Sequence, residues 1–201
     1  DGEPRSLLGL LGQIVASRIF QDLSVPDIVA AVLEEHGVPA SRPRWQLEAT
    51  YPPRTYCVQY QEDALSFCHR LLEKEGIFYA FATGEEGEEV VFSDRSSACA
   101  PIEGDIEVAY VEQSGQTHAE GVIHRLRRRH RVMEGAVVLR DYDFERPDLD
   151  LTTEAKSDVD ADLAVYDFPG GYVEPGEGAR YARVALEARQ CERERIEAQG
   201  S

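Results

Sequence analysis

The residues best suited to chemistry include an acidic triplet, Asp158, Asp160 and Asp162. Alternating aspartates open the loops that bind calcium in EF-hands, which then need a glycine at position 163 and a glutamate at position 169. The chain has Leu163 and Pro169 at these two positions. The triplet is therefore predicted to be a solvated acidic turn and not a metal site.

Three histidines, His118, His124 and His130, follow one another at intervals of six residues. An unbroken strand would place them on one face, because side chains of a strand alternate between its two faces. Residues six apart on a strand lie roughly 20 Å apart, so these side chains cannot share one metal ion. We expect exposed or hydrogen-bonded histidines.

Candidates for nucleophilic and nucleotide chemistry each fail at a particular position. Cys68 and His69 are neighbours in a predicted helix and point in different directions, whereas a nucleophile and its base must face each other. The segment 176–178 begins like a dinucleotide-binding loop, but Tyr181 stands where the third glycine belongs. Neither the P-loop motif GxxxxGK[ST] nor the GxSxG motif occurs. The sequence therefore predicts no enzyme, and no catalytic, cofactor-binding or metal-binding residue.

One basic run, residues 125–131, holds five of the 21 lysines and arginines in a chain of formal net charge -17. Nucleic acid needs a larger basic footprint, and aromatic side chains do not interleave this run. The acidity of the chain equally disfavours an anionic membrane surface. An ion-paired strand or a subunit contact is the favoured interpretation, with no nucleic acid and no membrane insertion.

The composition is that of a globular protein: 201 residues, 42% of them hydrophobic and 29% charged. Its four cysteines include no CxxC pair, which favours free thiols, and Cys57 and Cys68 lie among apolar neighbours as small hydrophobes. The most apolar stretches, 7–16 and 28–33, are shorter than the roughly 20 residues that span a bilayer. Residues 1–4 lack the basic start of a signal peptide.

Two helices are predicted from capping signals and apolar spacing. Ser24 can cap a helix that has Asp27 in its first turn and stops at Gly37. Asp63 can cap a second helix over residues 64–75, which Gly76 ends.

A third helix is predicted over residues 177–198, after a long irregular connection over 145–175. Its apolar stripe is Tyr181, Val184, Ala185, Ala188 and Cys191, and Arg183 with Glu187 forms an i,i+4 pair. Strands are predicted at 56–60, 77–81, 90–92, 106–111, 121–132 and 136–143. The pattern indicates an α+β fold of antiparallel hairpins with a few amphipathic helices, divided into subdomains at 1–100 and 101–201.

Several segments in a fixed order resemble one family, the VgrG proteins of type VI secretion, and the related phage late control D and contractile tail hub proteins. The most recognisable block is the segment 67–79, which combines a capped helix, a glycine stop and an aromatic strand. The conspicuous residues of these blocks are expected to determine the fold and not to bind ligands. The similar segments are 18–29, 54–60, 67–79, 90–94, 139–147, 166–172 and 182–187.

The resemblance implies a structural hub with barrel-like subdomains that connects the tube to the spike. It implies a homotrimer when the protein is full length, with an Hcp-like tube protein, the spike or needle region and secreted effectors as partners. It also implies residence in the bacterial cytoplasm before firing and secretion as part of the spike. The chain is expected to be a partial hub that lacks the spike and needle region.

Three alternatives remain open. A tail hub of a contractile phage or phage-derived particle would have the same physical properties as a secretion hub. A hydrolytic effector would need two facing carboxyl groups about 5–9.5 Å apart in a cleft. An acidic metal-binding module would bind calcium or zinc.

Overall fold

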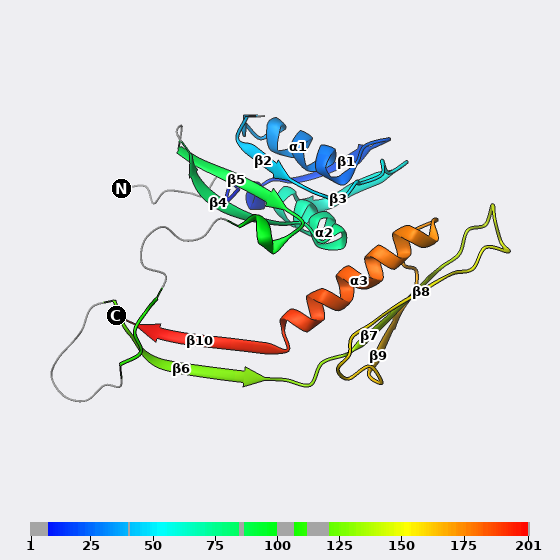
Figure 1. The fold of residues 1–201 in the computed structure, drawn as a ribbon. Coiled ribbons are helices and arrows are strands. Elements are labelled where there is room, and N and C mark those ends of the chain that lie inside the picture. The colour runs from blue at the N-terminus through cyan, green and yellow to red at the C-terminus, as the bar shows by residue number, and fades with distance from the viewer. Residues whose placement is uncertain (1–7, 40, 85–86, 100–106, 112–120, 201) are drawn as a thin grey trace. The chain divides into compact units, whose positions relative to one another are not determined.

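Short helices and strands follow each other irregularly along the chain in the computed structural model, which describes residues 8–39, 41–84, 87–99, 107–111 and 121–200 (Figure 1). The chain divides into two units, residues 1–99 and 100–201. The elements of the first unit are η1 (Leu11–Gln13), β1 (Val15–Phe20), α1 (Val25–Glu35), β2 (Pro43–Gln46), β3 (Cys57–Asp63), α2 (Ala64–Glu75), β4 (Phe78–Gly84), β5 (Gly87–Ser93) and η2 (Ser96–Ala98).

Both helices of the first unit begin and end as their sequences predict. The Ser24 hydroxyl accepts a hydrogen bond from the backbone N–H of Asp27 at 3.3 Å, and the Asp63 carboxylate accepts one from Ser66 N–H at 2.8 Å. These bonds satisfy amide groups that a helix start leaves without a partner. Gly76 ends α2 in the left-handed conformation, with φ of +75°.

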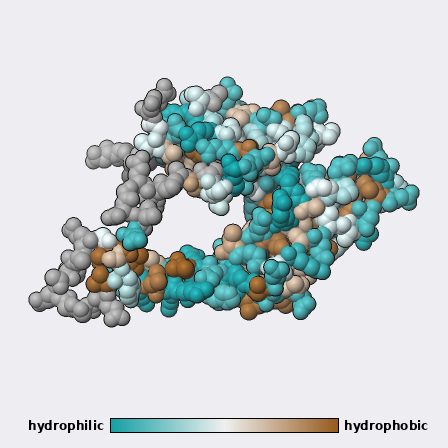
Figure 2. Space-filling view, in the orientation of Figure 1, coloured by the Kyte–Doolittle hydropathy of each residue, from teal (hydrophilic) through white to brown (hydrophobic). Residues whose placement is uncertain are grey.

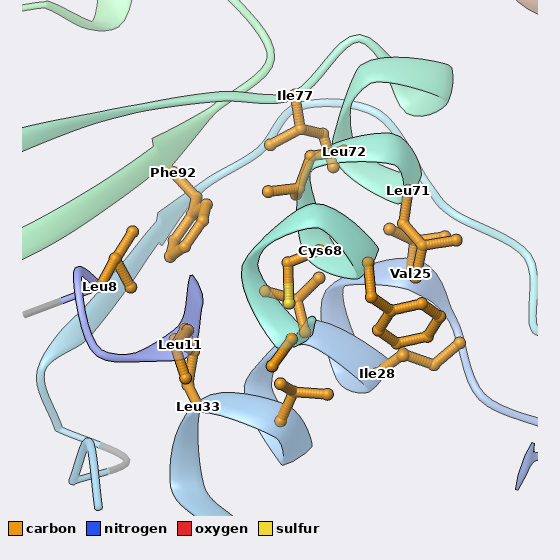
Figure 3. Packing of buried hydrophobic residues seen from close by; sticks show 14 of the residues in the cluster. Leu8, Leu11, Val25, Ile28, Leu33, Cys68, Leu71, Leu72, Ile77 and Phe92 are labelled. Carbon is orange, nitrogen blue, oxygen red and sulfur yellow. The ribbon is translucent and has the colours of Figure 1, made fainter. Parts of the chain in front are cut away.

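The strands of the first unit form two small sheets. β1 pairs antiparallel with β3, and β5 lies between β2, its parallel neighbour, and β4, its antiparallel one. The predicted hairpin is thereby confirmed as β4 and β5. Phe67 of α2 and Phe92 of β5 are fully buried in a core that α1 and α2 share with the sheets (Figure 3). Trp45 stacks on Phe92, with ring centroids 4.4 Å apart.

The second unit contains a sheet covered on one face by a helix, and a separate two-stranded ribbon. In the sheet, β7 pairs antiparallel with β8 and parallel with β9, and α3 packs on the face that carries Val137, Leu139 and Leu151. The ribbon consists of β6 and β10, paired antiparallel (Figure 1). Its elements are β6 (Ile123–His130), β7 (Ala136–Asp141), β8 (Leu151–Lys156), β9 (Ala164–Asp167), α3 (Pro175–Cys191) and β10 (Glu194–Gly200).

Three predictions about the second unit are wrong. The connection 145–175 is not irregular throughout, because it contains β8 and β9. The last helix stops at Cys191, and Ala188 and Cys191 of its expected stripe are exposed. Residues 107–111 contribute an isolated bridge from Tyr110 to Ile123 in place of a strand, and residue 106 lies outside the described part.

The missed strand β8 and the overextended last helix have related physical causes. β8 presents small and polar residues with little apolar contrast, and β10 alternates so weakly that its sequence extends the helical pattern before it. Pairing with β7, the preceding strand, makes β8 a strand, and pairing with β6, which lies far away in the sequence, makes β10 one. The α+β class is confirmed.

Candidate functional site

The acidic triplet lies in the turn between β8 and β9. Asp160 forms an ion pair with Arg193, while Asp158 and Asp162 are exposed. Asp162 and Glu134 line an open cavity of about 390 Å³ beside the turn. Over the described ranges of the chain, no group of three or more His, Cys, Asp or Glu side chains could hold a metal ion. Asp160 is thus a structural partner, which corrects the prediction of a wholly solvated turn.

The histidines separate along the second unit. His118 lies outside the described residues, and His124 and His130 both belong to β6. His124 is half-buried and His130 is exposed. His130 lies directly opposite Glu194 of β10. The ladder thus places this histidine beside a carboxylate on an exposed ribbon.

Cys68 and His69 point in different directions, as predicted. Cys68 is buried in the first core, and burial raises the pKa of its thiol to about 12. A thiol with so high a pKa is protonated at neutral pH and is a poor nucleophile. A ring nitrogen of His69 lies 2.8 Å from the Tyr79 hydroxyl instead. The pair cannot act as a thiolate and base.

The glycines of segment 176–178 serve packing. A Cβ on Gly178 would lie 2.3 Å from the Tyr172 ring, so this first turn of α3 passes directly against a buried aromatic side chain. A Cβ on Gly176 would meet nothing within 4 Å. The resemblance of this segment to a nucleotide loop therefore reflects close contact between α3 and Tyr172.

Charged side chains of the first unit hold its strands to α2. Arg70 donates hydrogen bonds to both carboxylate oxygens of Glu62 and, at 2.7 Å, to the carbonyl of Val58. These bonds from Arg70 lower the pKa of Glu62. Arg54 pairs with the buried Glu75 at 2.8 Å. The conspicuous residues of segment 67–79 thus determine the fold.

In the second unit, the buried Tyr172 connects several elements, as Arg70 does in the first. Its hydroxyl lies 3.0 Å from the carbonyl oxygen of Leu139 in β7 and 2.5 Å from that of Leu151 in β8. Because its ring packs against Gly178, Tyr172 connects α3 to these two strands. Nearby, Asp143 accepts a hydrogen bond from Arg146 at 2.8 Å, and this bond lowers the pKa of Asp143. The segments 139–147 and 166–172 therefore also contain residues that determine the fold.

The basic run forms most of β6, and the prediction of an ion-paired strand holds for its arginines Arg128 and Arg129. Arg128 approaches both carboxylate oxygens of Glu194 in β10, at 2.7 and 2.8 Å. Arg129 lies 3.6 Å from Glu197. The sequence did not identify β10 as the partner strand, because only Ile196 and Ala198 interrupt its charged and polar residues.

Several large apolar side chains are exposed on each unit. The predicted strand 56–60 is confirmed as part of β3, but its pleat buries Cys57 and Gln59 and leaves Tyr60 69% exposed. Figure 2 shows hydrophobic residues at several places on an otherwise hydrophilic surface. Large exposed apolar residues include Val15, Ile19, Tyr56 and Tyr60 in the first unit, and Tyr142, Phe144, Tyr166 and Phe168 in the second.

Such exposed apolar groups are typical of proteins that bind other proteins, since monomers rarely leave large apolar areas in water. None of the helices in the described ranges has both the length and the apolar character needed to cross a bilayer.

Comparison with known proteins gives a consistent result. Residues 4–201 match the family model described as phage tail baseplate hub (GPD). The type VI secretion system spike protein VgrG4b of Pseudomonas aeruginosa is 40% identical over 190 residues, which are 92% of this chain and 23% of the relative. VgrG5 of the same organism is 38% identical over 194 residues, or 94% of this chain and 24% of the relative. The chain thus spans about a quarter of the length of these relatives.

Solved structures agree with the sequence relatives. The E. coli c3393 protein, described as a type VI secretion component with structural similarity to the T4 bacteriophage tail proteins gp27 and gp5, is 28% identical with a TM-score of 0.50. The match covers 63% of this chain and 33% of that protein. A tail protein from Neisseria meningitidis matches 94% of this chain and 55% of its own, with a TM-score of 0.59 and 12% identity, which bears on the fold alone.

Proposed function

This chain belongs to the phage tail baseplate hub (GPD) family, and we propose that it forms part of the structural hub of a type VI secretion spike. One observation carries the proposal: spike proteins are 38–40% identical to the chain over nearly its whole length. The two units at residues 1–99 and 100–201 would then be two subdomains of that hub.

A structural and non-enzymatic role fits the chemistry of the described residues. The segments 67–79 and 139–147 contribute hydrogen bonds and ion pairs that tie strands to helices and turns. The buried Cys68 thiol has too high a pKa for nucleophilic work. One relative, of 31% identity, is named as an actin cross-linking toxin VgrG1, but this chain covers only 16% of it.

The partners follow from the family and from the exposed surfaces. We expect the full-length protein to form a homotrimer that contacts an Hcp-like tube protein, a spike or needle region and secreted effectors. The exposed aromatic residues Tyr60 and Phe144, which are 69% and 81% accessible, supply apolar area for such contacts. The protein would reside in the bacterial cytoplasm before firing and leave the cell with the spike.

A phage or phage-derived tail hub is the second candidate, and the description of the matching family favours it. Identity favours the secretion spike. VgrG4b and VgrG5 of P. aeruginosa, both named as type VI secretion spike proteins, are 40% and 38% identical to the chain.

Secretion of the tube protein tests the proposal in the bacterium that encodes the chain. Deleting the gene, or replacing Phe67 by alanine to unfold the first core, is expected to abolish release of the Hcp-like protein into the medium. The exposed variant Arg183→Gln serves as the control and retains release. Unchanged release after deletion contradicts the proposal, and loss of contractile phage particles in its place identifies the second candidate.

The oligomeric state is tested separately on the full-length protein. Native mass spectrometry across a range of concentrations is expected to detect a trimer. A full-length protein that stays monomeric at every concentration contradicts the trimer. The hub role is tested independently by the secretion experiment.

A further inference from the structure

The β6–β10 ribbon carries arginines on one of its two faces. Directly opposed residues in an antiparallel pair share a face, and the register opposes Arg125 to Gln199, Arg127 to Glu197 and Arg129 to Arg195. This arginine face therefore has four arginines and a single glutamate. It belongs to a chain whose formal net charge is -17, so the positive charge is local.

The other face of the ribbon is different in kind. It carries Leu126 opposite Ala198 and Arg128 opposite Ile196, with Leu126 58% and Ile196 60% exposed. Its arginine, Arg128, is held by both oxygens of Glu194. The charge of this second face is thus balanced within the ribbon, whereas that of the arginine face is not.

The arginine face has fewer carboxylates than guanidinium groups. Glu197 is shared by Arg129 and Arg195, each 3.6 Å away, which is beyond hydrogen-bond distance. Within the part of the chain that the structure describes, neither Arg125 nor Arg127 takes part in an ion pair, and β6 is exposed from Arg125 to His130. At least two guanidinium groups therefore remain available to an external anion.

The pairing of Arg129 with Arg195 favours the binding of an external anion. Like charges directly opposite each other on a sheet destabilise it, and a neutral residue at either position would avoid the cost. A local conflict of this kind is typical of functional surfaces, because an anionic partner removes the repulsion when it binds.

The geometry of the face selects the class of anion. Arginines at every second residue of a strand repeat at roughly 6.8 Å, the same interval as alternate carboxylates on an extended chain. Guanidinium groups bind carboxylates through two parallel hydrogen bonds. The six opposed residues of the face include no aromatic side chain on which nucleic-acid bases could stack.

We propose that the arginine face, through Arg125, Arg127 and Arg195, binds a carboxylate-rich extended segment of a partner protein. The proposal concerns a surface and a class of partner, and it stands whether or not the chain serves as a secretion hub. Its tests use the purified 201-residue chain and do not depend on secretion.

Fluorescence anisotropy with labelled poly-L-glutamate measures the proposed chemistry. We expect saturable binding at low ionic strength that weakens toward 0.15 M salt, because the contacts are exposed and ionic. The double variant Arg125→Gln/Arg127→Gln is expected to weaken binding about tenfold. The matched control Arg140→Gln/Arg183→Gln removes the same charge from exposed positions of β7 and α3 and keeps affinity within about twofold.

Arg195→Gln provides a readout that a structural role of the arginine would not produce. We expect weaker poly-L-glutamate binding together with a rise of about 1–3 °C in the unfolding temperature of the free chain, because the opposed charges are relieved. A fall in the unfolding temperature would show that Arg195 stabilises the ribbon and would overturn the proposal.

Three binding results would also overturn it. These are no saturable binding of poly-L-glutamate at low salt, an equal loss of affinity in the Arg140→Gln/Arg183→Gln control, or tighter binding of oligothymidylate than of poly-L-glutamate. The last result would assign the face to nucleic-acid phosphates.

Discussion

The two units of the chain are stabilised in different ways. In the first, α1 and α2 bury a cluster of 17 residues, including two fully buried phenylalanines, Phe67 and Phe92. In the second, the cluster has seven buried residues, and one tyrosine, Tyr172, supplies both apolar contact and hydrogen bonds at its centre. The first unit thus depends on apolar volume and the second on a few close contacts.

The two units should therefore respond differently to substitutions and to binding partners. A large core supports a rigid body whose exposed residues can be changed without loss of the fold. A small core with a long, exposed β6–β10 ribbon leaves more of the second unit dependent on what binds it, since a two-stranded ribbon has marginal stability by itself. The comparison predicts large effects of core changes in the first unit and effects of specific contacts in the second.

The largest expected effect is at Phe67 in the first unit. Phe67→Ala should lower the free energy of unfolding by about 3–5 kcal/mol, because it leaves a cavity among fully buried neighbours. Trp45, the single tryptophan of the chain, lies in this unit and reports its unfolding by fluorescence in urea. Tyr60→Ala, at a residue of the same unit that is 69% exposed, is the control and should change the transition little.

Two glycines in the first turn of α3 should respond with opposite sign. Gly178→Ala is expected to destabilise the second unit by about 1–3 kcal/mol, because its Cβ would collide with the Tyr172 ring. Gly176→Ala meets open space and should stabilise α3 by up to about 1 kcal/mol. Thermal unfolding followed by circular dichroism measures both, and equal responses would contradict the packing of Tyr172 against Gly178.

Tyr172→Phe should cost about 1–2 kcal/mol, since carbonyl oxygens of Leu139 and Leu151 lose a buried hydroxyl. Hydrogen exchange is expected to accelerate in β7, β8 and α3 and to stay unchanged in α1 and α2. Tyr142→Phe, at an exposed tyrosine, is the matched control. Faster exchange in both units would show that they do not unfold separately.

The smallest expected effect is a dependence on pH. The hydrogen bond from Arg70 lowers the folded-state pKa of Glu62 below its value in the unfolded chain. The resulting stability is present above the unfolded pKa, near 4.5, and is lost as the pH falls through the folded pKa. Glu62→Gln should therefore flatten the acid limb of the first unit's stability by less than about 1 kcal/mol, measured by urea unfolding of Trp45 at several pH values. If the fall in unfolding free energy at acid pH is the same in Glu62→Gln as in the original chain, Glu62 does not cause it.

Much of the fold could be predicted from local sequence. The starts and ends of α1 and α2 depend on side chains within three residues of each helix start and on Gly37 and Gly76. The β4–β5 hairpin and the strand character of β7 follow from runs of apolar and β-branched residues. The ordered segments that resemble VgrG proteins also required only the sequence.

Other features depended on partners distant in the sequence. β10 follows a helix without a break in its pattern, and only the antiparallel pairing with β6 makes it a strand. The alternation of Tyr56, Val58 and Tyr60 predicted β3, but not that its aromatic face lies in solvent while Gln59 is buried. Burial depends on which neighbours the pleat meets, and these come from other elements.

By itself, therefore, the sequence determined the helices with their caps, the absence of an organised catalytic motif and the family to which the chain belongs. These properties reside in residue types and short spacings. Tertiary structure alone decided that the basic run faces β10, that Arg129 lies opposite Arg195 and that Tyr172 fills the space at Gly178. Each of these contacts joins residues more than five positions apart, whose proximity arises only when the strands pair and the helix packs.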